Sequence, residues 1–394
     1  MTVSRNFVLA AGGTGGHIIP AYALGAELMR RGHQVALITD NRGSAIPGCP
    51  DNMDMHVMPA GRVAGGPRGW FAAARNIWRG RAMARELFDE FDPTAVIGFG
   101  GYPALPALLA AFSHKIPTIV HEQNAVLGRV NRLVAGKVNA IATAYPDVQR
   151  IKSGHSEKVH LVGNPVRAEV VALRDEPFPP FIEDGVFRVL VTGGSQGASI
   201  LSDIVPDALA RLPLNLRRRL QVTQQCRAED IEKVRATYAD HQIPAQLATY
   251  LDDFPEWLGW SHLVIGRAGA STIAELTCSG RPAILVPLPS AMDNHQAYNV
   301  SEMVKAGGAR AINQAAFTPV ELAKQIQKMA LLPETLENAA RAAKSCGRPD
   351  AVHDLADLVE SFGRAPLMQT LTTREENGLN LGGAQPAMAK EAAV

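Results

Sequence analysis

The stretch VLAAGGTGGH at residues 8–17 decides the fold, because a close variant of it, VLVTGGSQGA, stands at residues 189–198. Each copy is typical of an apolar strand that runs into a glycine-rich turn with a hydroxyl group, followed by apolar residues at helical spacing such as Leu24 and Leu28. Two such openings of a βαβ unit predict an α/β protein with two doubly wound domains facing each other across a cleft. Backbone N–H groups at the start of each helix make this cleft a candidate site for a phosphate-bearing substrate.

Length and composition agree with two soluble domains. The chain has 394 residues, of which 46% are hydrophobic and 20% charged. Its four cysteines form no CxxC pair, so we expect neither a disulfide framework nor a zinc site, and a reducing cytoplasm is favoured. The first residues lack the features of a signal peptide, so we do not expect export. The apolar stretch at 95–112 is interrupted by glycines and prolines and predicts a buried strand, a turn and a helix rather than a membrane span.

Strands that are apolar on both faces alternate with helical stretches in both halves, which is typical of parallel sheets covered by helices. We expect strands at 7–11, 34–39, 54–58, 95–98, 118–121, 140–143 and 159–162, and then at 188–192, 221–223, 245–250, 262–265, 283–286 and 309–312. A hinge is expected at 163–167. The predicted domains are residues 1–164 and 165–345, with 346–362 providing a helix that packs back on the body and 363–394 a disordered tail.

The first glycine turn leaves several interpretations open. Asp40, at the end of the second predicted strand, is where a dinucleotide fold places its ribose-binding acid, but the glycine spacing does not fit G-x-G-x-x-G, and no Walker lysine follows. Backbone N–H groups beside the imidazole of His17 suit a diphosphate or an alcohol that must lose a proton. Alternatively, the turn is merely tight and His17 caps the helix.

Two polar clusters follow predicted buried strands. In the second half, the segment 267–275 offers small residues and hydroxyl groups at a helix start, and a polar cluster at 293–296 with Asn299 lies beyond the next strand, where open sheets hold ligands. A capped helix with an acid in its first turn is the alternative. In the first half, four polar residues at 121–124 are costly to bury unless they face a cleft, although a structural hydrogen-bond network could also hold them.

The segment 62–85 carries six arginines and no acid, interleaved with aromatic residues. It lies in the more basic half, since residues 1–164 have 17 Lys and Arg against 11 Asp and Glu, whereas 165–394 have 22 against 27. A basic aromatic helix is a candidate for an anionic membrane surface, whereas no nucleic-acid motif accompanies it. A solvated face with its aromatic residues in the core is the alternative. The candidate membrane residues are Arg68, Trp70, Phe71, Arg75, Ile77, Trp78 and Arg79.

Together, the turn at 12–17, the clusters at 121–124 and 163–167, the turn at 193–197 and the segments 267–275 and 293–296 resemble the GT-B glycosyltransferases that add N-acetylglucosamine to lipid I in peptidoglycan synthesis. The resemblance spans about residues 7–345. It implies a first domain that presents lipid I and associates with the membrane, and a second domain that binds UDP-N-acetylglucosamine. The residues implied in donor binding are Thr14, Gly15, Gly16, Asn124, Arg167, Ser195, Leu251, Ala270, Ser271, Thr272, Glu275 and Gln296, with His295 in doubt because some relatives have glutamine there.

The resemblance implies an inverting transfer to the C4 hydroxyl of the N-acetylmuramyl unit. His17 is the first candidate for the base and Glu122 the second. No cofactor is expected, and no metal, because no D-x-D pair ends a strand. We expect peripheral attachment to the cytoplasmic face of the inner membrane, and other cell-wall synthesis proteins are conceivable partners, but not nucleic acid. The alternatives are a GT-B UDP-sugar transferase or epimerase with a soluble substrate, and a nucleotide-sugar sensor or scaffold.

Overall fold

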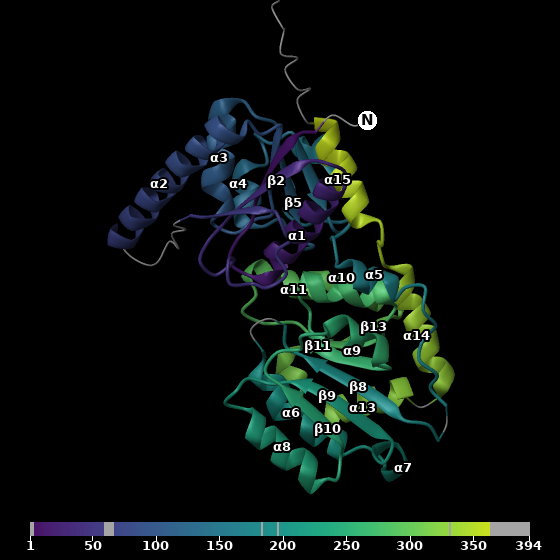
Figure 1. Cartoon of the computed structure of the whole chain (residues 1–394). Helices are drawn as coiled ribbons and strands as arrows, with labels where there is room; N and C mark the ends of the chain where they lie inside the picture. Colours follow the sequence, from purple (N-terminus) through teal and green to yellow (C-terminus); the bar gives the residue numbers. More distant parts are fainter. Residues whose placement is uncertain (1–3, 59–66, 183, 195–196, 331, 363–394) are drawn as a thin grey trace, which may run out of the picture.

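The computed structural model describes residues 4–58, 67–182, 184–194, 197–330 and 332–362, and the side chains of 67–70 are not among the described ones. Two parallel sheets form separate halves of the molecule, with α1, α10 and α11 between them (Figure 1). The predicted fold class of two doubly wound domains facing each other is confirmed. The predicted tail at 363–394 lies outside the described residues.

The first sheet has seven strands in the order β3-β2-β1-β4-β5-β6-β7, all parallel. They are β1 (Asn6–Ala10), β2 (Gln34–Thr39), β3 (Asp54–Val57), β4 (Ala95–Gly98), β5 (Thr118–Glu122), β6 (Ala140–Thr143) and β7 (Val159–Leu161). The second sheet has six parallel strands in the order β10-β9-β8-β11-β12-β13. They are β8 (Phe187–Thr192), β9 (Leu220–Gln225), β10 (Ala245–Ala248), β11 (Leu263–Arg267), β12 (Ala283–Val286) and β13 (Ala309–Ala311).

Helices connect the strands. In the first half these are α1 (Gly15–Arg30), α2 (Pro67–Phe91), α3 (Ala104–His114) and α4 (Arg129–Val134). In the second half they are α5 (Ala168–Ala172), α6 (Ser199–Ala210), α7 (Leu214–Arg217), α8 (Ile231–Asp240), α9 (Phe254–Trp260), α10 (Ala270–Ser279), α11 (His295–Asn299), α12 (Ser301–Ala306), α13 (Pro319–Ala330) and α14 (Pro333–Ser345), followed by α15 (Ala351–Phe362). Within the described ranges, no helix has the length and hydropathy needed to cross a bilayer.

Alternating residues of each central strand pack into two hydrophobic cores, one on either face of the sheet. In β1, Phe7 and Leu9 pack in the cluster that contains residues of α1 and α15, whereas Val8 and Ala10 pack in the cluster that contains residues of α2 and α3. The same division occurs at β8. Because both faces are covered, the strands are apolar throughout, as the sequence pattern predicts.

The glycine turn after β1 lies where the strand order reverses, between β1 and β4. A Cβ atom on Gly12 would lie 2.2 Å from Cγ of Pro103, and Gly13 has a φ of +85°, which a residue with a side chain rarely adopts. The turn is therefore packed tightly against the loop after β4, and it brings the start of α1 to the carboxyl edge of the sheet, where doubly wound proteins bind ligands.

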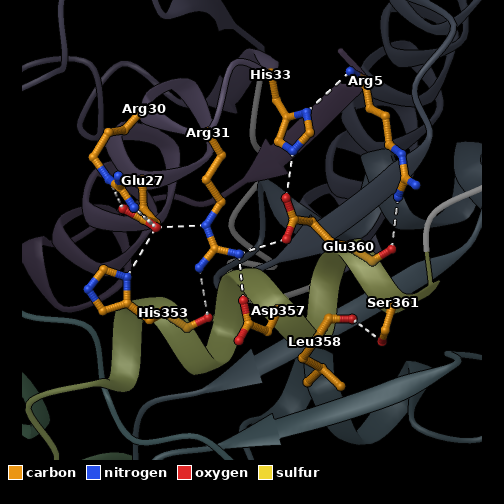
Figure 2. Close-up of polar contacts among 10 residues, drawn as sticks. All are labelled: Arg5, Glu27, Arg30, Arg31, His33, His353, Asp357, Leu358, Glu360 and Ser361. Atoms are coloured by element: carbon orange, nitrogen blue, oxygen red, sulfur yellow. Dashed lines mark hydrogen bonds and ion pairs between the residues drawn. The ribbon is translucent and has the colours of Figure 1, made fainter. Parts of the chain in front are cut away.

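Helix α15 follows the second domain in sequence but packs on α1 of the first domain, so the chain crosses between the domains twice (Figure 1). A polar network fastens it (Figure 2). Arg31 pairs with Asp357 at 2.5 Å and with Glu360 at 2.6 Å, and Glu360 also contacts His33 at 2.6 Å. The last described helix thus completes the first domain.

Candidate active site

His17 extends from the first turn of α1 and contacts the polar cluster after β5. Its Nδ1 lies 3.0 Å from Oε1 of Gln123, so it does not cap its own helix, as one interpretation of the sequence supposed. The Gln123 amide is oriented by the carbonyl of Phe99, which accepts a hydrogen bond from Nε2 at 3.0 Å. Oε1 of Gln123 therefore accepts the proton of His17 Nδ1, which leaves Nε2 of His17 with its lone pair.

The same chain of hydrogen bonds continues to the interdomain segment. His121 donates from Nε2 to the carbonyl of Gly163 at 2.8 Å, so its Nδ1 is free to accept from Nε2 of Gln123 at 3.1 Å. Burial lowers the pKa of His121 to about 4, which keeps this ring neutral. Burial also lowers the pKa of His17, although the charge of Glu122 opposes that shift. His17 is therefore a neutral imidazole near pH 7, as a general base must be.

Glu122, the second candidate base, has hydrogen-bond donors on both of its carboxylate oxygens. Its Oε1 accepts from the backbone N–H and the side-chain amide of Asn124 at 3.0 and 3.2 Å, and its Oε2 accepts from Gly128 N at 2.7 Å and Asn131 Nδ2 at 2.9 Å. The residue is 2% exposed. With four hydrogen bonds already made, this carboxylate holds the loop 122–131 together, so His17 is the better of the two candidate bases.

The expectation that residues 121–124 face a cleft is wrong for three of the four. His121, Glu122 and Gln123 are buried, and only Asn124 is partly exposed. The cost of burying them is offset by the hydrogen bonds described above, so the network interpretation is the correct one for these three. The network nevertheless ends on His17.

Asp40 is also occupied. Its Oδ1 accepts from the backbone N–H of Gly13 at 3.1 Å and of Gly43 at 2.9 Å, and its Oδ2 pairs with Arg42 at 3.1 Å. The carboxylate that a dinucleotide fold would offer to a ribose thus holds the first glycine turn in place.

Thr14, Gly15 and Gly16 form the start of α1, and the Thr14 side chain makes no capping hydrogen bond.

The candidate donor residues of the second domain gather at the start of α10. Oγ of Ser271 is buried without a hydrogen-bond partner among the described residues, beside Ala270 and Thr272 in the first turn, whose backbone N–H groups are unpaired by the helix. A buried hydroxyl without a partner at a helix N-terminus is suited to an anionic ligand. Ser195 lies outside the described residues.

One turn further along α10, Glu275 is buried and accepts from Nη2 of Arg167 at 2.7 Å. Burial raises the pKa of Glu275, and the charge of Arg167 opposes that rise. The Arg167 guanidinium lies over the ring of Phe254, 5.7 Å from its centroid, and Leu251 is buried in the same cluster as Phe254. Arg167 therefore contacts both Glu275 of α10 and Phe254, which begins α9 three residues after Leu251.

In the polar cluster at 293–296, after β12, two side chains are bonded to backbone groups of the same loop. Gln296 accepts from the backbone N–H of Leu288 through Oε1 at 2.9 Å, which leaves its Nε2 available. His295 donates from Nδ1 to the carbonyl of Met292 at 2.9 Å. A charge on His295 would lower the pKa of His17, so the two side chains lie within electrostatic range of each other across the domain interface.

Two contacts between the domains involve residues with no prediction of a role. Arg132 of α4 and Arg150 pair with Asp293 at 2.6 and 3.2 Å. Nothing in their local sequence marks these arginines, because their partner lies in the other domain. A small cavity of about 30 Å³ also lies between the domains, and among the described donor candidates only Ala270 lines it.

Helix α2 carries the predicted membrane residues. Phe71 and Trp78 are 82% and 70% exposed, and Arg75 and Arg79 are exposed beside them. Ile77 packs against the core instead. The interpretation that the aromatic residues of this segment are in the core is thus wrong for Phe71 and Trp78. The side chains of Arg68 and Trp70, in the first turn of α2, lie outside the described part.

Residues 7–143 match the glycosyltransferase family 28 N-terminal domain, and residues 188–355 match the glycosyltransferase family 28 C-terminal domain. The chain belongs to this family. Among the curated members, proteins from Novosphingobium aromaticivorans and Erythrobacter litoralis are 67% and 65% identical over 94% and 95% of this chain, covering 95% and 94% of their own lengths. Both are named UDP-N-acetylglucosamine--N-acetylmuramyl-(pentapeptide) pyrophosphoryl-undecaprenol N-acetylglucosamine transferase.

Solved structures agree with this family 28 assignment. The crystal structure of Acinetobacter baumannii MurG has a TM-score of 0.73 at 27% identity and covers 91% of this chain and 99% of that one. UDP-GlcNAc 2-epimerase from Neisseria meningitidis, solved with UDP-GlcNAc bound, has a TM-score of 0.59 at 14% identity over 91% of this chain and all of that one, and shares the fold alone. The resemblance to GT-B N-acetylglucosaminyltransferases is confirmed, and this family 28 protein is an enzyme of glycosyl transfer.

Proposed function

We propose that this enzyme transfers N-acetylglucosamine from UDP-N-acetylglucosamine to lipid I and so forms lipid II for peptidoglycan synthesis. The observation that carries the proposal is that two neighbouring helices, one from each domain, each begin with a group suited to this reaction. His17 at the start of α1 presents a neutral Nε2, and α10, which contacts α1, begins with the Ser271 hydroxyl, which has no hydrogen-bond partner in the described part of the chain. The names of the curated relatives support this choice of donor and acceptor.

The proposed chemistry is a single inverting displacement. The C4 oxygen of the N-acetylmuramyl unit attacks C1 of N-acetylglucosamine, the bond from C1 to the diphosphate oxygen breaks, and UDP leaves with the electron pair. Nε2 of His17 takes the hydroxyl proton, and the hydrogen bond from Nδ1 to Gln123 holds the ring in the tautomer that this requires.

Stabilisation of the leaving diphosphate is assigned to the first turn of α10. The partial positive charge of the helix N-terminus, the hydroxyl of Ser271 and that of Thr272 all favour an anion there. Glu275, held by Arg167, is assigned to the ribose hydroxyls, Leu251 to the uracil ring and Gln296 to the sugar. With these groups the proposed reaction uses no cofactor.

The acceptor is proposed to reach the enzyme from an anionic membrane. Phe71 and Trp78 would enter the interface between headgroups and acyl chains, while Arg75 and Arg79 would contact anionic lipid. The enzyme would thus be peripheral, on the cytoplasmic face of the inner membrane, with the pyrophosphate of lipid I near residues 12–17.

Incubation with labelled UDP-N-acetylglucosamine and a lipid I analogue tests the reaction. We expect a disaccharide-linked lipid product in an amount equal to the UDP released, and no product when the acceptor is omitted. Release of UDP without an acceptor-dependent product would contradict the proposal and favour a GT-B enzyme with a soluble substrate.

A further inference from the structure

Helix α11 belongs to the second domain, but residues of the first domain hold both of its ends. Just before the helix, Asp293 accepts a hydrogen bond from Nη2 of Arg132 at 2.6 Å and pairs with Nη2 of Arg150 at 3.2 Å. Asp293 is the less exposed partner, at 17% of its side chain. Two cations of one domain thus converge on one carboxylate of the other.

At the last residue of α11, Asn299 makes the second attachment. Its Oδ1 accepts from the backbone N–H of Ala125 at 2.8 Å, and its Nδ2 donates to Oδ1 of Asn124 at 3.1 Å and to the carbonyl of Ala268 at 3.3 Å. Asn299 is fully buried. One amide therefore joins the loop after β5 to the loop before α10, and its removal would leave a buried backbone N–H unpaired.

The two residues before α11 have an unusual backbone conformation. Asp293 and Asn294 have φ values of 55° and 56°, in the left-handed region that asparagine and aspartate tolerate best among residues with side chains. Such a conformation persists where surrounding contacts hold it, and here the two arginines of the first domain supply them.

The helix between the two attachments carries Gln296, which is assigned to the donor sugar, and His295 beside it. Its first-domain attachments also connect to the base, because Asn124 directly follows Gln123, whose Oε1 accepts from Nδ1 of His17. Contacts at both ends of α11 therefore set how the sugar-facing residues of one domain lie relative to the base of the other.

We propose that Asp293 and Asn299 are positioning residues that form an interdomain latch with Arg132, Arg150, Asn124 and Ala125. The latch holds α11 against the first domain so that donor sugar, acceptor hydroxyl and His17 are aligned for transfer. The inference rests on the proposed function, because alignment matters only if the two substrates meet between the domains.

The test uses Asp293→Ala and Asn299→Ala in the full chain, with UDP binding by calorimetry and kcat/KM for the lipid I analogue as paired readouts. The residues assigned to the uridine and the diphosphate make none of the latch contacts, so affinity for UDP, which carries no sugar, should stay within about twofold. Asn124 is the one implied donor residue in the latch, and both variants keep its side chain. The value of kcat/KM should fall about 10- to 100-fold, because small misplacements of reacting groups are costly. Asp203→Ala breaks the pair of Asp203 with Lys233 at 2.7 Å inside the second domain and should change neither readout.

Three further variants separate alignment from folding. Arg132→Lys keeps the charge and should retain most of the activity that Arg132→Ala loses. The double variant Arg132→Ala/Asp293→Ala should be no worse than Asp293→Ala alone, because both remove the same contact. Small-angle scattering of Asp293→Ala without substrate should give a larger radius of gyration than that of the wild type.

Two results would overturn the latch: unchanged kcat/KM in both alanine variants, or a loss of UDP affinity equal to the loss of kcat/KM, which would mean that the residues only support the second domain. Failure of the proposed function would look different. The wild type itself would then make no lipid-linked product, while the scattering comparison would still report whether Asp293 holds the domains together.

Discussion

At the scale of single residues, three side chains link the start of α1 to the interdomain segment. His17 donates to Gln123, Gln123 donates to His121, and His121 donates to the carbonyl of Gly163. In this network, the acceptor that each side chain faces determines which of its atoms donates. Groups that are distant in sequence therefore place the proton of His17 on Nδ1. The candidate base therefore depends on a hydrogen-bond network as much as on its own ring.

His17→Ala should lower kcat about 10²- to 10⁴-fold at saturating substrates, because removing a general base typically costs that much. UDP affinity should be unchanged, since the residues assigned to UDP do not include His17. Because burial lowers the pKa of His17, its neutral form persists below the ordinary value of 6.5. The acid limb of the wild-type kcat profile should accordingly lie below that value. Near-normal turnover of the variant between pH 6 and 9 would remove His17 from the mechanism.

At the scale of elements, α2 packs one face into the core and exposes the other to solvent. Ala73, Ala84, Leu87 and Phe88 are buried, whereas Phe71 and Trp78 point into solvent. The sequence pattern predicted an amphipathic basic helix, but it did not separate the aromatic residues on the outside from Ile77 on the inside. That separation depends on where α3 packs, which no local pattern contains.

Phe71→Ser/Trp78→Ser should weaken sedimentation with vesicles of anionic lipid, because each change removes exposed apolar surface that would be buried in the bilayer interface. Arg75→Gln/Arg79→Gln should weaken binding by about 1 kcal/mol per removed charge, and less at high salt. Turnover of a short-chain, soluble lipid I analogue should not change in either variant. Leu214→Ser, at a 49% exposed leucine of the second domain, is the matched control and should bind vesicles as the wild type does. Equal sedimentation of all four proteins would refute a membrane role for α2.

At the scale of the whole molecule, the last helix of the described chain belongs physically to the first domain. Leu355, Ala356 and Val359 of α15 complete the core that contains Phe7 and Leu9 of β1. The network in Figure 2 adds ion pairs on the outer side of this contact. The second domain is thus inserted between two parts of the first, which limits how freely the two can separate.

Leu355→Ala should therefore destabilise the first domain, by about 2–5 kcal/mol as for other buried leucines. Hydrogen exchange would detect faster exchange in β1 and β4 than in β8 and β11. Leu336→Ala in α14, equally buried but in the core of the second domain, should give the reverse pattern. If Leu355→Ala accelerated exchange in the second domain instead, the assignment of α15 to the first domain core would be wrong.

Most of the fold could be predicted from the sequence, because strands and turns are largely local. All thirteen predicted strands form, with ends shifted by a few residues. The predicted strand at 245–250 ends at Ala248, since the carbonyl of Thr249 is bonded by the side chain of Gln225 rather than by a neighbouring strand. The candidate site was less predictable, because a polar run such as 121–124 has the same letters whether its side chains face a ligand or one another.

The sequence by itself determined the two glycine turns, the two parallel sheets and the candidate residues at their edges, since these depend on alternation, spacing and the conformational freedom of glycine. Only the tertiary structure decided which nitrogen of His17 is free, that Glu122 is saturated by donors, and that Asp293 and Asn299 join the domains. The physical reason is that protonation, burial and pairing are set by atoms brought together from distant parts of the chain, and their distances exist only once both domains have folded and met.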